Sequence, residues 1–251
     1  MRTVLLVACL LFSAIHAWAG ETLKIAAGLW LEPYVIQGKP PRGMELDIVR
    51  EALQHAGFQV TFILQPFHRS KLLFTTGEVD GVMTIQESFP EAKAAYLSER
   101  YIAYRNQAIS LQTRQLQIYS MADLQGFSVE AFQQAQFALG EEFAAVVRKH
   151  PSYSETADQR TQVLKLLAGR TDVAVMDERI FRYQQARLQK QPPVNVPPYL
   201  LRGTVEMHNL FPATWYRIAF RKPALRDAFD RGLAFLRTSH RYQQIVDQYL
   251  Q

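Results

Sequence analysis

Two polar residues stand where the ends of two strands would present them to a ligand. Thr84 and Asp177 each come directly after an apolar segment that ends in Val-Met. The two segments, residues 72–83 and 166–176, echo each other: each holds a glycine followed three residues later by an aspartate. In open α/β sheets, ligands bind beyond the carboxyl ends of the strands. The echo therefore predicts two sheets of like construction, with Thr84 and Asp177 facing one shared cleft.

No catalytic or metal-binding motif accompanies these residues. The sequence has no G-x-S-x-G, H-E-x-x-H, Walker or G-x-G-x-x-G pattern. The histidines are isolated and lack the spacing of metal ligands, and a single cysteine excludes both a thiolate zinc site and an internal disulfide. We therefore expect no metal and no cofactor, and we assign no catalytic residue.

The composition is that of a packed globular protein. Of 251 residues, 48% are hydrophobic, which is ample for a core and argues against long disordered tracts. Lys and Arg number 28 against 23 Asp and Glu, and the basic residues are scattered without a run of five or more. Nucleic acid is therefore not an expected partner.

The segments that position Thr84 and Asp177 alternate between strand and helix. Apolar residues recur at strand and at helix spacing in turn, and glycines follow the helix ends. This alternation, found in two successive runs, predicts parallel α/β sheets. The expected strands are residues 22–27, 59–64, 79–83, 127–130, 172–176 and 215–220, and the expected helices are 44–56, 69–76, 134–150, 161–168, 178–189, 223–237 and 240–250.

The first 19 residues have the pattern of a secretory signal peptide. Arg2 precedes an apolar run over residues 4–15, and Ala17-Trp18-Ala19 supplies small residues for cleavage. The run is short for a membrane span. Cys9 lies in a lipoprotein-like box, but in the middle of the run, so cleavage after Ala19 is favoured. The expected product is a periplasmic protein with 27 Lys and Arg, 23 Asp and Glu, and no cysteine.

Several short motifs occur in order along the rest of the chain. They are residues 23–28 (LKIAAG) with 33–34 (PY), 43–49 (GMELDIV), 77–81 (GEVDG), 97–101 (LSERY), 120–126 (SMADLQG), 169–177 (GRTDVAVMD), 218–222 (IAFRK) and 242–245 (YQQI). Each motif is weak, but their order resembles that of the bacterial extracellular solute-binding proteins of the polar amino-acid type.

The resemblance implies a two-lobed periplasmic-binding-protein fold. Each lobe would be a mostly parallel sheet flanked by helices, and the chain would cross twice between the lobes with the ligand in the cleft. Lobe one would comprise residues 20–107 and 206–251, and lobe two residues 108–205. The first crossing would fall near residues 105–110.

One departure from the family pattern bears on the ligand. Amino-acid binders of this family carry an Arg shortly after the third strand, which holds the ligand carboxylate in a bidentate contact. Here residues 88–93 read SFPEAK and contain no Arg. Asp177 matches the acid that often receives an α-amino group in the family. We therefore expect a small polar ligand with an amine or hydroxyl, and weak binding of ordinary α-amino acids.

Three more residues are candidates for ligand contacts. Arg69, which begins a helix, could replace the missing clamp, or it could be a surface arginine. Trp30 and Tyr34 lie in the loop after the first strand and resemble the family's ring platforms, although one of them could instead fill the core of the lobe. The full set of expected ligand-binding residues is Trp30, Tyr34, Arg69, Thr84 and Asp177.

Three functions remain open. The first is a monomeric, non-enzymatic solute-binding protein that serves an ABC-type transporter or a sensor in the membrane. The second is a cyclohexadienyl-dehydratase-like enzyme on the same scaffold, in which Glu32 or Asp177 acts as general acid. Glu32 could equally be a solvated loop residue, and Asp177 a helix cap. The third is an orphan binding module that has lost its ligand.

Overall fold

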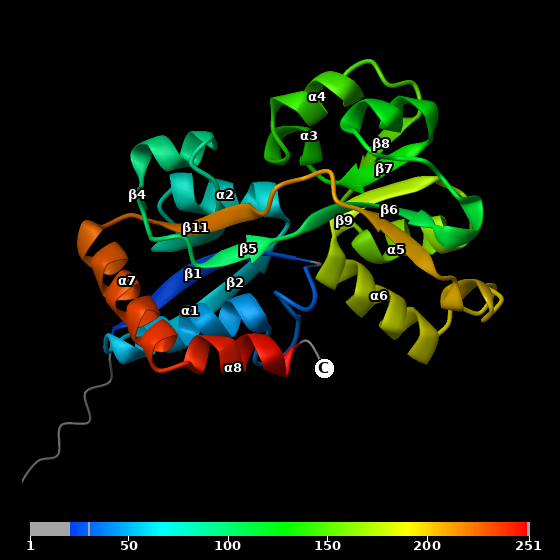
Figure 1. The fold of residues 1–251 in the computed structure, drawn as a ribbon. Helices are drawn as coiled ribbons and strands as arrows, with labels where there is room; N and C mark the ends of the chain where they lie inside the picture. Colours follow the sequence, from blue (N-terminus) through cyan, green and yellow to red (C-terminus); the bar gives the residue numbers. More distant parts are fainter. Residues whose placement is uncertain (1–20, 30, 250–251) are drawn as a thin grey trace, which may run out of the picture.

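The chain forms two α/β lobes joined by two crossings (Figure 1). The computed structural model describes residues 21–29 and 31–249. The two-lobed α/β class predicted from the sequence is confirmed. The predicted signal peptide and Trp30 lie outside the described residues. Within the described part, no helix is long and apolar enough to cross a membrane.

The sheet of lobe one has the order β2-β1-β3-β11-β4, and β5 also pairs with β11. β1 pairs in parallel with β2 and β3, because a helix carries the chain back after each of the first two strands. β11 arrives from the other lobe and pairs antiparallel with β3, β4 and β5. The strands are β1 (Thr22–Gly28), β2 (Gln59–Gln65), β3 (Gly81–Ile85), β4 (Tyr96–Leu97), β5 (Ile102–Tyr104) and β11 (Thr214–Phe220).

The helices of lobe one are α1 (Met44–His55), α2 (Phe67–Thr75), α7 (Pro223–Thr238) and α8 (Arg241–Gln248), with a short 3-10 turn η1 (Pro90–Ala94). Helix α1 packs closely against α7. At the contact, a Cβ on Gly232 would lie 1.9 Å from the carbonyl oxygen of Ala52, so only glycine lets the two backbones approach. This packing builds the core beneath the sheet.

The sheet of lobe two has the order β10-β6-β9-β7-β8. β7 pairs in parallel with β8 and β9, whereas β6 is antiparallel to both β9 and β10. The strands are β6 (Asn106–Leu111), β7 (Val129–Phe132), β8 (Tyr153–Thr156), β9 (Val173–Asp177) and β10 (Val205–His208). The helices are α3 (Ala135–Ala138), α4 (Glu141–Val147), α5 (Gln159–Leu167) and α6 (Glu178–Lys190), with 3-10 turns η2 (Gln112–Arg114), η3 (Met121–Gly126) and η4 (Leu200–Arg202).

Sheet membership shows where the chain crosses between the lobes. β5 belongs to the first sheet and β6 to the second, so the first crossing is at Arg105. β10 pairs with β6, so the return crossing follows His208 and not residue 205. The antiparallel pairings arise because β6 and β11 are the strands that carry the chain between lobes. The helix expected over residues 134–150 is instead two helices, separated at Gly140, whose φ is 93°.

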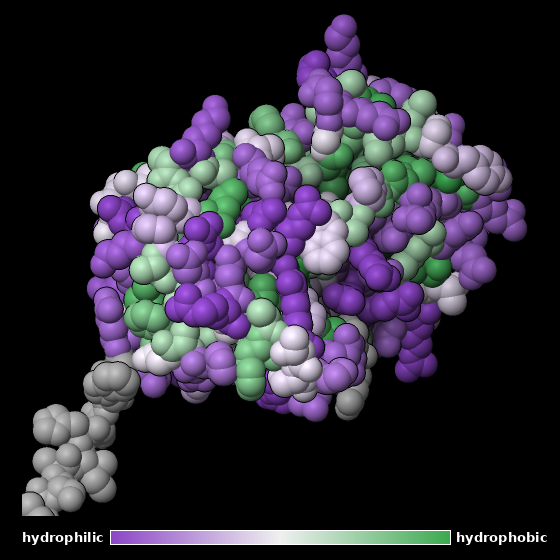
Figure 2. Space-filling view, turned by 60° about the vertical axis from the view of Figure 1, so that its left-hand side comes forward, coloured by the Kyte–Doolittle hydropathy of each residue, from purple (hydrophilic) through white to green (hydrophobic). Residues whose placement is uncertain are grey.

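The two lobes share buried hydrophobic side chains next to the first crossing. Tyr34 and Tyr104 belong to the same buried cluster as Ile109 and Ile180 of lobe two. On the face shown in Figure 2, hydrophilic side chains alternate with smaller hydrophobic areas over both lobes. The shared cluster continues to the cavity between the lobes, because Tyr104 and Ile180 also line that cavity.

Candidate functional site

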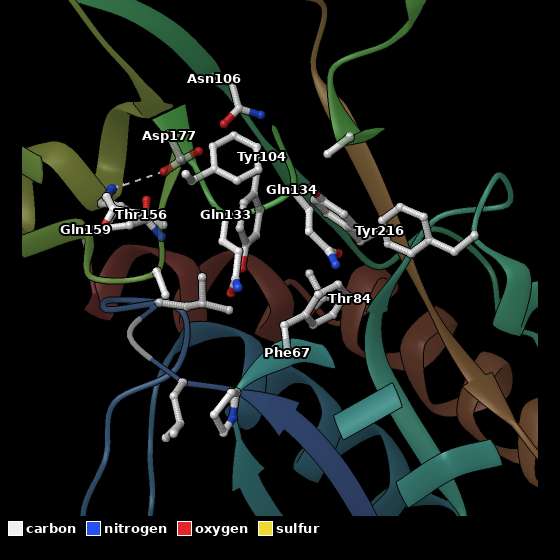
Figure 3. A pocket seen from close by; sticks show the side chains of 18 residues that line it. Phe67, Thr84, Tyr104, Asn106, Gln133, Gln134, Thr156, Gln159, Asp177 and Tyr216 are labelled. Atoms are coloured by element: carbon white, nitrogen blue, oxygen red, sulfur yellow. Dashed lines mark hydrogen bonds between the residues drawn. The ribbon is translucent and has the colours of Figure 1, made fainter. Parts of the chain in front are cut away.

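A cavity lies between the lobes, and both lobes contribute to its walls (Figure 3). Its volume, counted as space open to the centre of a water molecule, is about 90 Å³. The carboxyl ends of β3, β7, β8 and β9 all meet this space, as expected for ligand sites in open α/β sheets. Its lining residues are Leu29, Leu31, Pro66, Phe67, Thr84, Phe89, Tyr104, Asn106, Phe132, Gln133, Gln134, Ala138, Thr156, Ala157, Gln159, Asp177, Ile180 and Tyr216.

Aromatic rings form the wall on the side of lobe one and the first crossing. Phe67 at the start of α2 meets Phe89 edge to face, with ring centroids 6.0 Å apart. Tyr104 at the crossing meets Tyr216 of β11 in the same manner at 4.9 Å. Edge-to-face contacts hold these rings in fixed orientations.

Amide side chains form much of the wall on the side of lobe two. Gln133 and Gln134 follow the end of β7, and Gln159 is the first residue of α5 (Figure 3). Asn106 begins β6 and donates from Nδ2 to Thr214 Oγ1 at 3.2 Å. An amide both donates and accepts hydrogen bonds without a net charge, so these four side chains are polar but neutral.

Asp177 lies at the predicted place, at the end of β9 and against the cavity, but its oxygens are occupied. Oδ1 accepts from the backbone N–H groups of Arg179 and Ile180 at 2.9 and 3.1 Å, which caps α6. Oδ2 accepts from the N–H of Arg105 at 2.7 Å. The Tyr34 hydroxyl lies 3.1 Å from both oxygens. The helix-cap interpretation left open by the sequence therefore accounts for its contacts.

Asp177 is buried, and burial disfavours the charged form of its carboxyl group. Only 1% of the residue is exposed. Burial raises the pKa of Asp177 to about 6, although the hydrogen bonds from Ile180, Arg105 and Tyr34 act in the opposite direction. A carboxylate whose oxygens already accept from four protein donors is poorly placed to receive a ligand amine.

Thr84 also lies against the cavity, but its hydroxyl donates to Glu45 Oε1 at 3.0 Å, into the core of lobe one. Its φ of 62° is unusual for a β-branched residue, and such strain collects at functional sites. Glu45 is fully buried and also accepts from the hydroxyls of Tyr101 and Tyr104, the latter at 3.0 Å. Burial raises the pKa of Glu45, and these three hydroxyls oppose the rise.

Tyr34 and Arg69 do not line the cavity. Tyr34 is fully buried, and its ring stacks on Tyr104 with centroids 4.1 Å apart. Because its hydroxyl meets Asp177, Tyr34 ties lobe one to lobe two behind the cavity wall, in the core-filling role that the sequence left open. Arg69 is exposed on α2. The structure thus brings Thr84 and Asp177 together and keeps Tyr34 and Arg69 out of the cavity.

Glu32, the other acid considered for catalysis, lies outside the cavity. It is 6% exposed and accepts from Gln184 Nε2 on α6 at 3.0 Å. Its other oxygen is 3.5 Å from the Arg187 guanidinium. These contacts form a second tie between the lobes. Among the described residues, no group of three or more His, Cys, Asp or Glu could hold a metal ion.

Sequence reasoning missed most of the cavity wall. Gln133 and Gln134 follow β7, and Thr156 ends β8, so the strand-end rule that located Asp177 applies to them as well. The sequence analysis, however, expects a strand over residues 127–130, which stops two residues before β7 ends, and it expects no strand at β8. Phe67, Tyr104 and Tyr216 meet only through tertiary packing, so no local pattern identifies them.

Comparison with known proteins gives the same architecture. The sequence model of the bacterial extracellular solute-binding proteins, family 3, matches residues 23–251. No curated protein matches the chain.

Among solved structures, a histidine kinase sensor domain with similarity to periplasmic binding proteins is similar over 92% of this chain and 97% of its own, with 19% identity and a TM-score of 0.75. An ancestral arginine-binding protein bound to arginine matches 93% of this chain and 100% of its own, with 18% identity and a TM-score of 0.71. An ancestral amino-acid-binding protein, a precursor of cyclohexadienyl dehydratase, matches 92% of this chain and 95% of its own, with 19% identity and a TM-score of 0.67. At these identities the likeness shows the fold.

Proposed function

We propose that this chain, which belongs to the bacterial extracellular solute-binding proteins, family 3, encloses one small polar solute between its lobes. The observation that carries the proposal is the interlobe cavity, whose walls come from the ends of strands in both sheets and from the first crossing. A solute in contact with both walls stabilises the closed arrangement, because an open arrangement offers only one wall.

The proposed solute has no free carboxylate. None of the described residues that line the cavity is a Lys or Arg. Arg69, which the sequence offered as a substitute clamp, is exposed on α2. An ordinary amino acid would therefore bury its carboxylate without a cationic partner, which is strongly unfavourable. A hydroxyl or amide group on the solute fits the neutral amide wall. An amine finds less support, because Asp177 already accepts from protein donors.

We further propose that the protein is exported to the periplasm and that its signal peptide is cleaved after residue 19. There it would pass its solute to a membrane permease, or signal the presence of the solute to a membrane sensor. The signal-peptide pattern of residues 1–19 supports export. Similarity to a kinase sensor domain and to amino-acid-binding proteins supports both kinds of partner.

A dehydratase on the same scaffold is the second candidate, supported by similarity to the dehydratase precursor. Such an enzyme needs a proton donor that reaches the substrate. Glu32 is engaged by Gln184 and lies outside the cavity, and Asp177 is engaged as a helix cap. Binding without catalysis is the better supported function.

A thermal-shift screen of the mature protein against amines, amides, polyols, sugars, amino acids and organic acids tests the proposal. A solute present at a hundred times its Kd adds about 2.7 kcal/mol to the free energy of unfolding, which is a visible shift in Tm. We expect a hit among solutes without a carboxylate. Absence of any hit would contradict the binding function and favour an orphan module.

A further inference from the structure

Gln159 is a nearly buried residue whose side-chain amide has no hydrogen-bond partner in the described part of the chain. It is 6% exposed, lines the cavity, and its side chain makes no hydrogen bond to any residue that the structure describes. The amide atoms of Gln159 are not fully buried, so they are accessible from the cavity that the residue lines. Gln134 is half-buried at the same cavity, and its side-chain amide also lacks a partner within the described residues, whereas Gln133 is exposed. The wall therefore offers amide groups that a bound molecule can satisfy.

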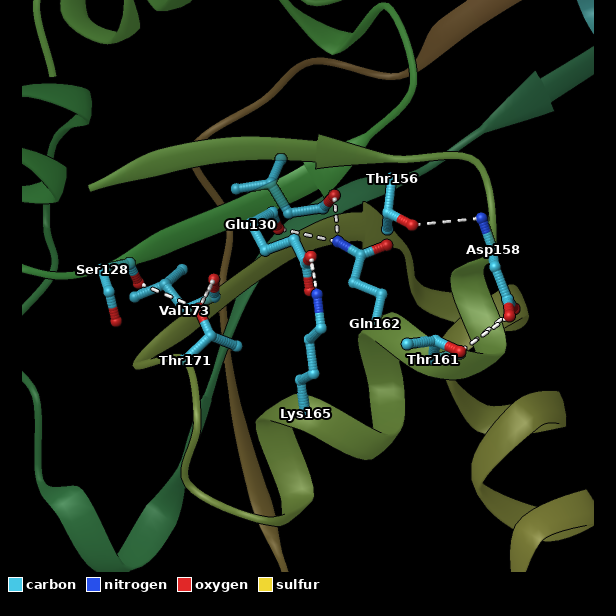
Figure 4. Close-up of polar contacts among 10 residues, drawn as sticks. Ser128, Glu130, Thr156, Asp158, Thr161, Gln162, Lys165, Thr171 and Val173 are labelled. Atoms are coloured by element: carbon cyan, nitrogen blue, oxygen red, sulfur yellow. Dashed lines mark hydrogen bonds and ion pairs between the residues drawn. The ribbon is translucent and has the colours of Figure 1, made fainter. Parts of the chain in front are cut away.

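The helix that carries Gln159 is firmly anchored (Figure 4). Gln162 Nε2 donates to the carbonyl oxygens of Glu130 and Val175 at 2.7 and 3.2 Å, and Lys165 pairs with Glu130 at 2.6 Å. These contacts fix α5 against β7 and β9. Gln159 is therefore held at the cavity by the sheet, as a specificity-determining side chain must be.

The amino end of α5 is not available to an anion. Asp158 Oδ1 accepts from the N–H groups of Arg160 and Thr161, each at 3.1 Å. The Lys71 ammonium lies 5.3 and 5.0 Å from the ring centroids of Phe67 and Phe89. Its ammonium is 3.5 Å from Glu91, and it does not line the cavity. A carboxylate on the ligand would thus be received neither by the amino end of α5 nor by the Lys71 ammonium.

The cavity has room for a small molecule. The space open to the centre of a water molecule is about 90 Å³, so the cavity takes a molecule larger than water. The aromatic side chains of Phe67, Tyr104 and Tyr216 in its wall favour a flat ring.

We propose that the site selects a neutral, single-ring amide or lactam, and that Gln159 is its specificity-determining residue. A primary amide or a lactam presents one donor and one acceptor on the same edge, which is the complement of the glutamine amide. The ring then lies against the aromatic wall. This inference rests on the proposed function, since it names the solute class of the same cavity.

The test is calorimetric titration of the mature protein with benzamide and 2-pyridone, and with benzoate as the matched carboxylate. We expect at least one neutral probe to bind about tenfold or more tightly than benzoate, equivalent to about 1.4 kcal/mol. Gln159→Glu keeps the shape but replaces the amide donors with a carboxylate, and it should weaken that probe about tenfold. Gln54→Glu, at an exposed position on α1 away from the cavity, is the control and should leave binding unchanged.

The outcomes separate this inference from the proposed function. Equal binding of benzoate and benzamide, or full binding by a folded Gln159→Glu variant, would overturn the inference. Failure of both neutral probes alongside a different hit in the solute screen would overturn it as well and leave the binding function standing. Failure of every solute would overturn the proposed function itself.

Discussion

Tyr34→Phe removes one hydroxyl from the contact that ties the lobes together. The ring of Phe can keep the stacking on Tyr104, but the 3.1 Å hydrogen bonds to both oxygens of Asp177 are lost. A hydrogen bond to a charged group contributes about 1.5–3 kcal/mol. Since 1.4 kcal/mol is a factor of ten, the ratio of closed to open protein should fall by roughly ten- to a hundredfold.

Two measurements test the effect of Tyr34→Phe. Chemical unfolding should report a free energy lower by about 1.5–3 kcal/mol, and small-angle scattering of the ligand-free protein should report a larger radius of gyration. The pKa of Asp177 should rise above its value of about 6, because the Tyr34 hydroxyl is one of the bonds that lower it.

Tyr249→Phe is the matched control. Its hydroxyl contacts Asp47 and the N–H of Gly43, all within lobe one. We expect this variant to lose stability without a change in the radius of gyration. A Tyr34→Phe variant as stable and as compact as the wild type would show that the contact between Tyr34 and Asp177 does not stabilise the closed form. Additive effects of Tyr34→Phe and Asp177→Asn on the unfolding free energy would contradict the reasoning as well.

Three further predictions concern charge, packing and export. Burial raises the pKa of Asp177 from 3.8 to about 6, so its contribution to stability is present below about pH 4 and is lost as the pH rises through 6. Unfolding curves should show the wild type losing on the order of 3 kcal/mol relative to Asp177→Asn over that range, and a flat difference would contradict the assignment. Gly232→Ala should lower the unfolding free energy by about 1–3 kcal/mol or more, because a Cβ would meet Ala52 at 1.9 Å; wild-type stability in denaturant would refute the packing argument. Mass spectrometry of periplasmic protein should find a chain that starts at Gly20 or Glu21, whereas a lipid on Cys9 would show a membrane-anchored product instead.

The sequence was sufficient for the fold class because the apolar periodicities and the repeated Gly-x-x-Asp segments are local signals. It also located Thr84 and Asp177 at the cavity, since both lie at strand ends. It could not assign their hydrogen bonds. Whether Asp177 meets a ligand or caps α6 depends on Arg105 and Tyr34, which are distant in sequence.

The aromatic wall was equally inaccessible to local reasoning. Phe67, Tyr104 and Tyr216 belong to α2, β5 and β11, and only the pairing of β5 with β11 brings the last two together. The second crossing was misplaced for a similar reason. β10 is a short strand whose partner, β6, lies about a hundred residues earlier in the chain.

The central claim is that the solute binds in the cavity between the lobes. The most direct test is calorimetric titration of the best solute from the screen into the wild type and into Ala138→Trp, which fills the cavity from its lobe-two wall. Ala145→Trp, at an exposed position on α4, is the control. The account predicts that Ala138→Trp abolishes binding while Ala145→Trp binds as the wild type does. Undiminished binding by a folded Ala138→Trp variant would contradict it.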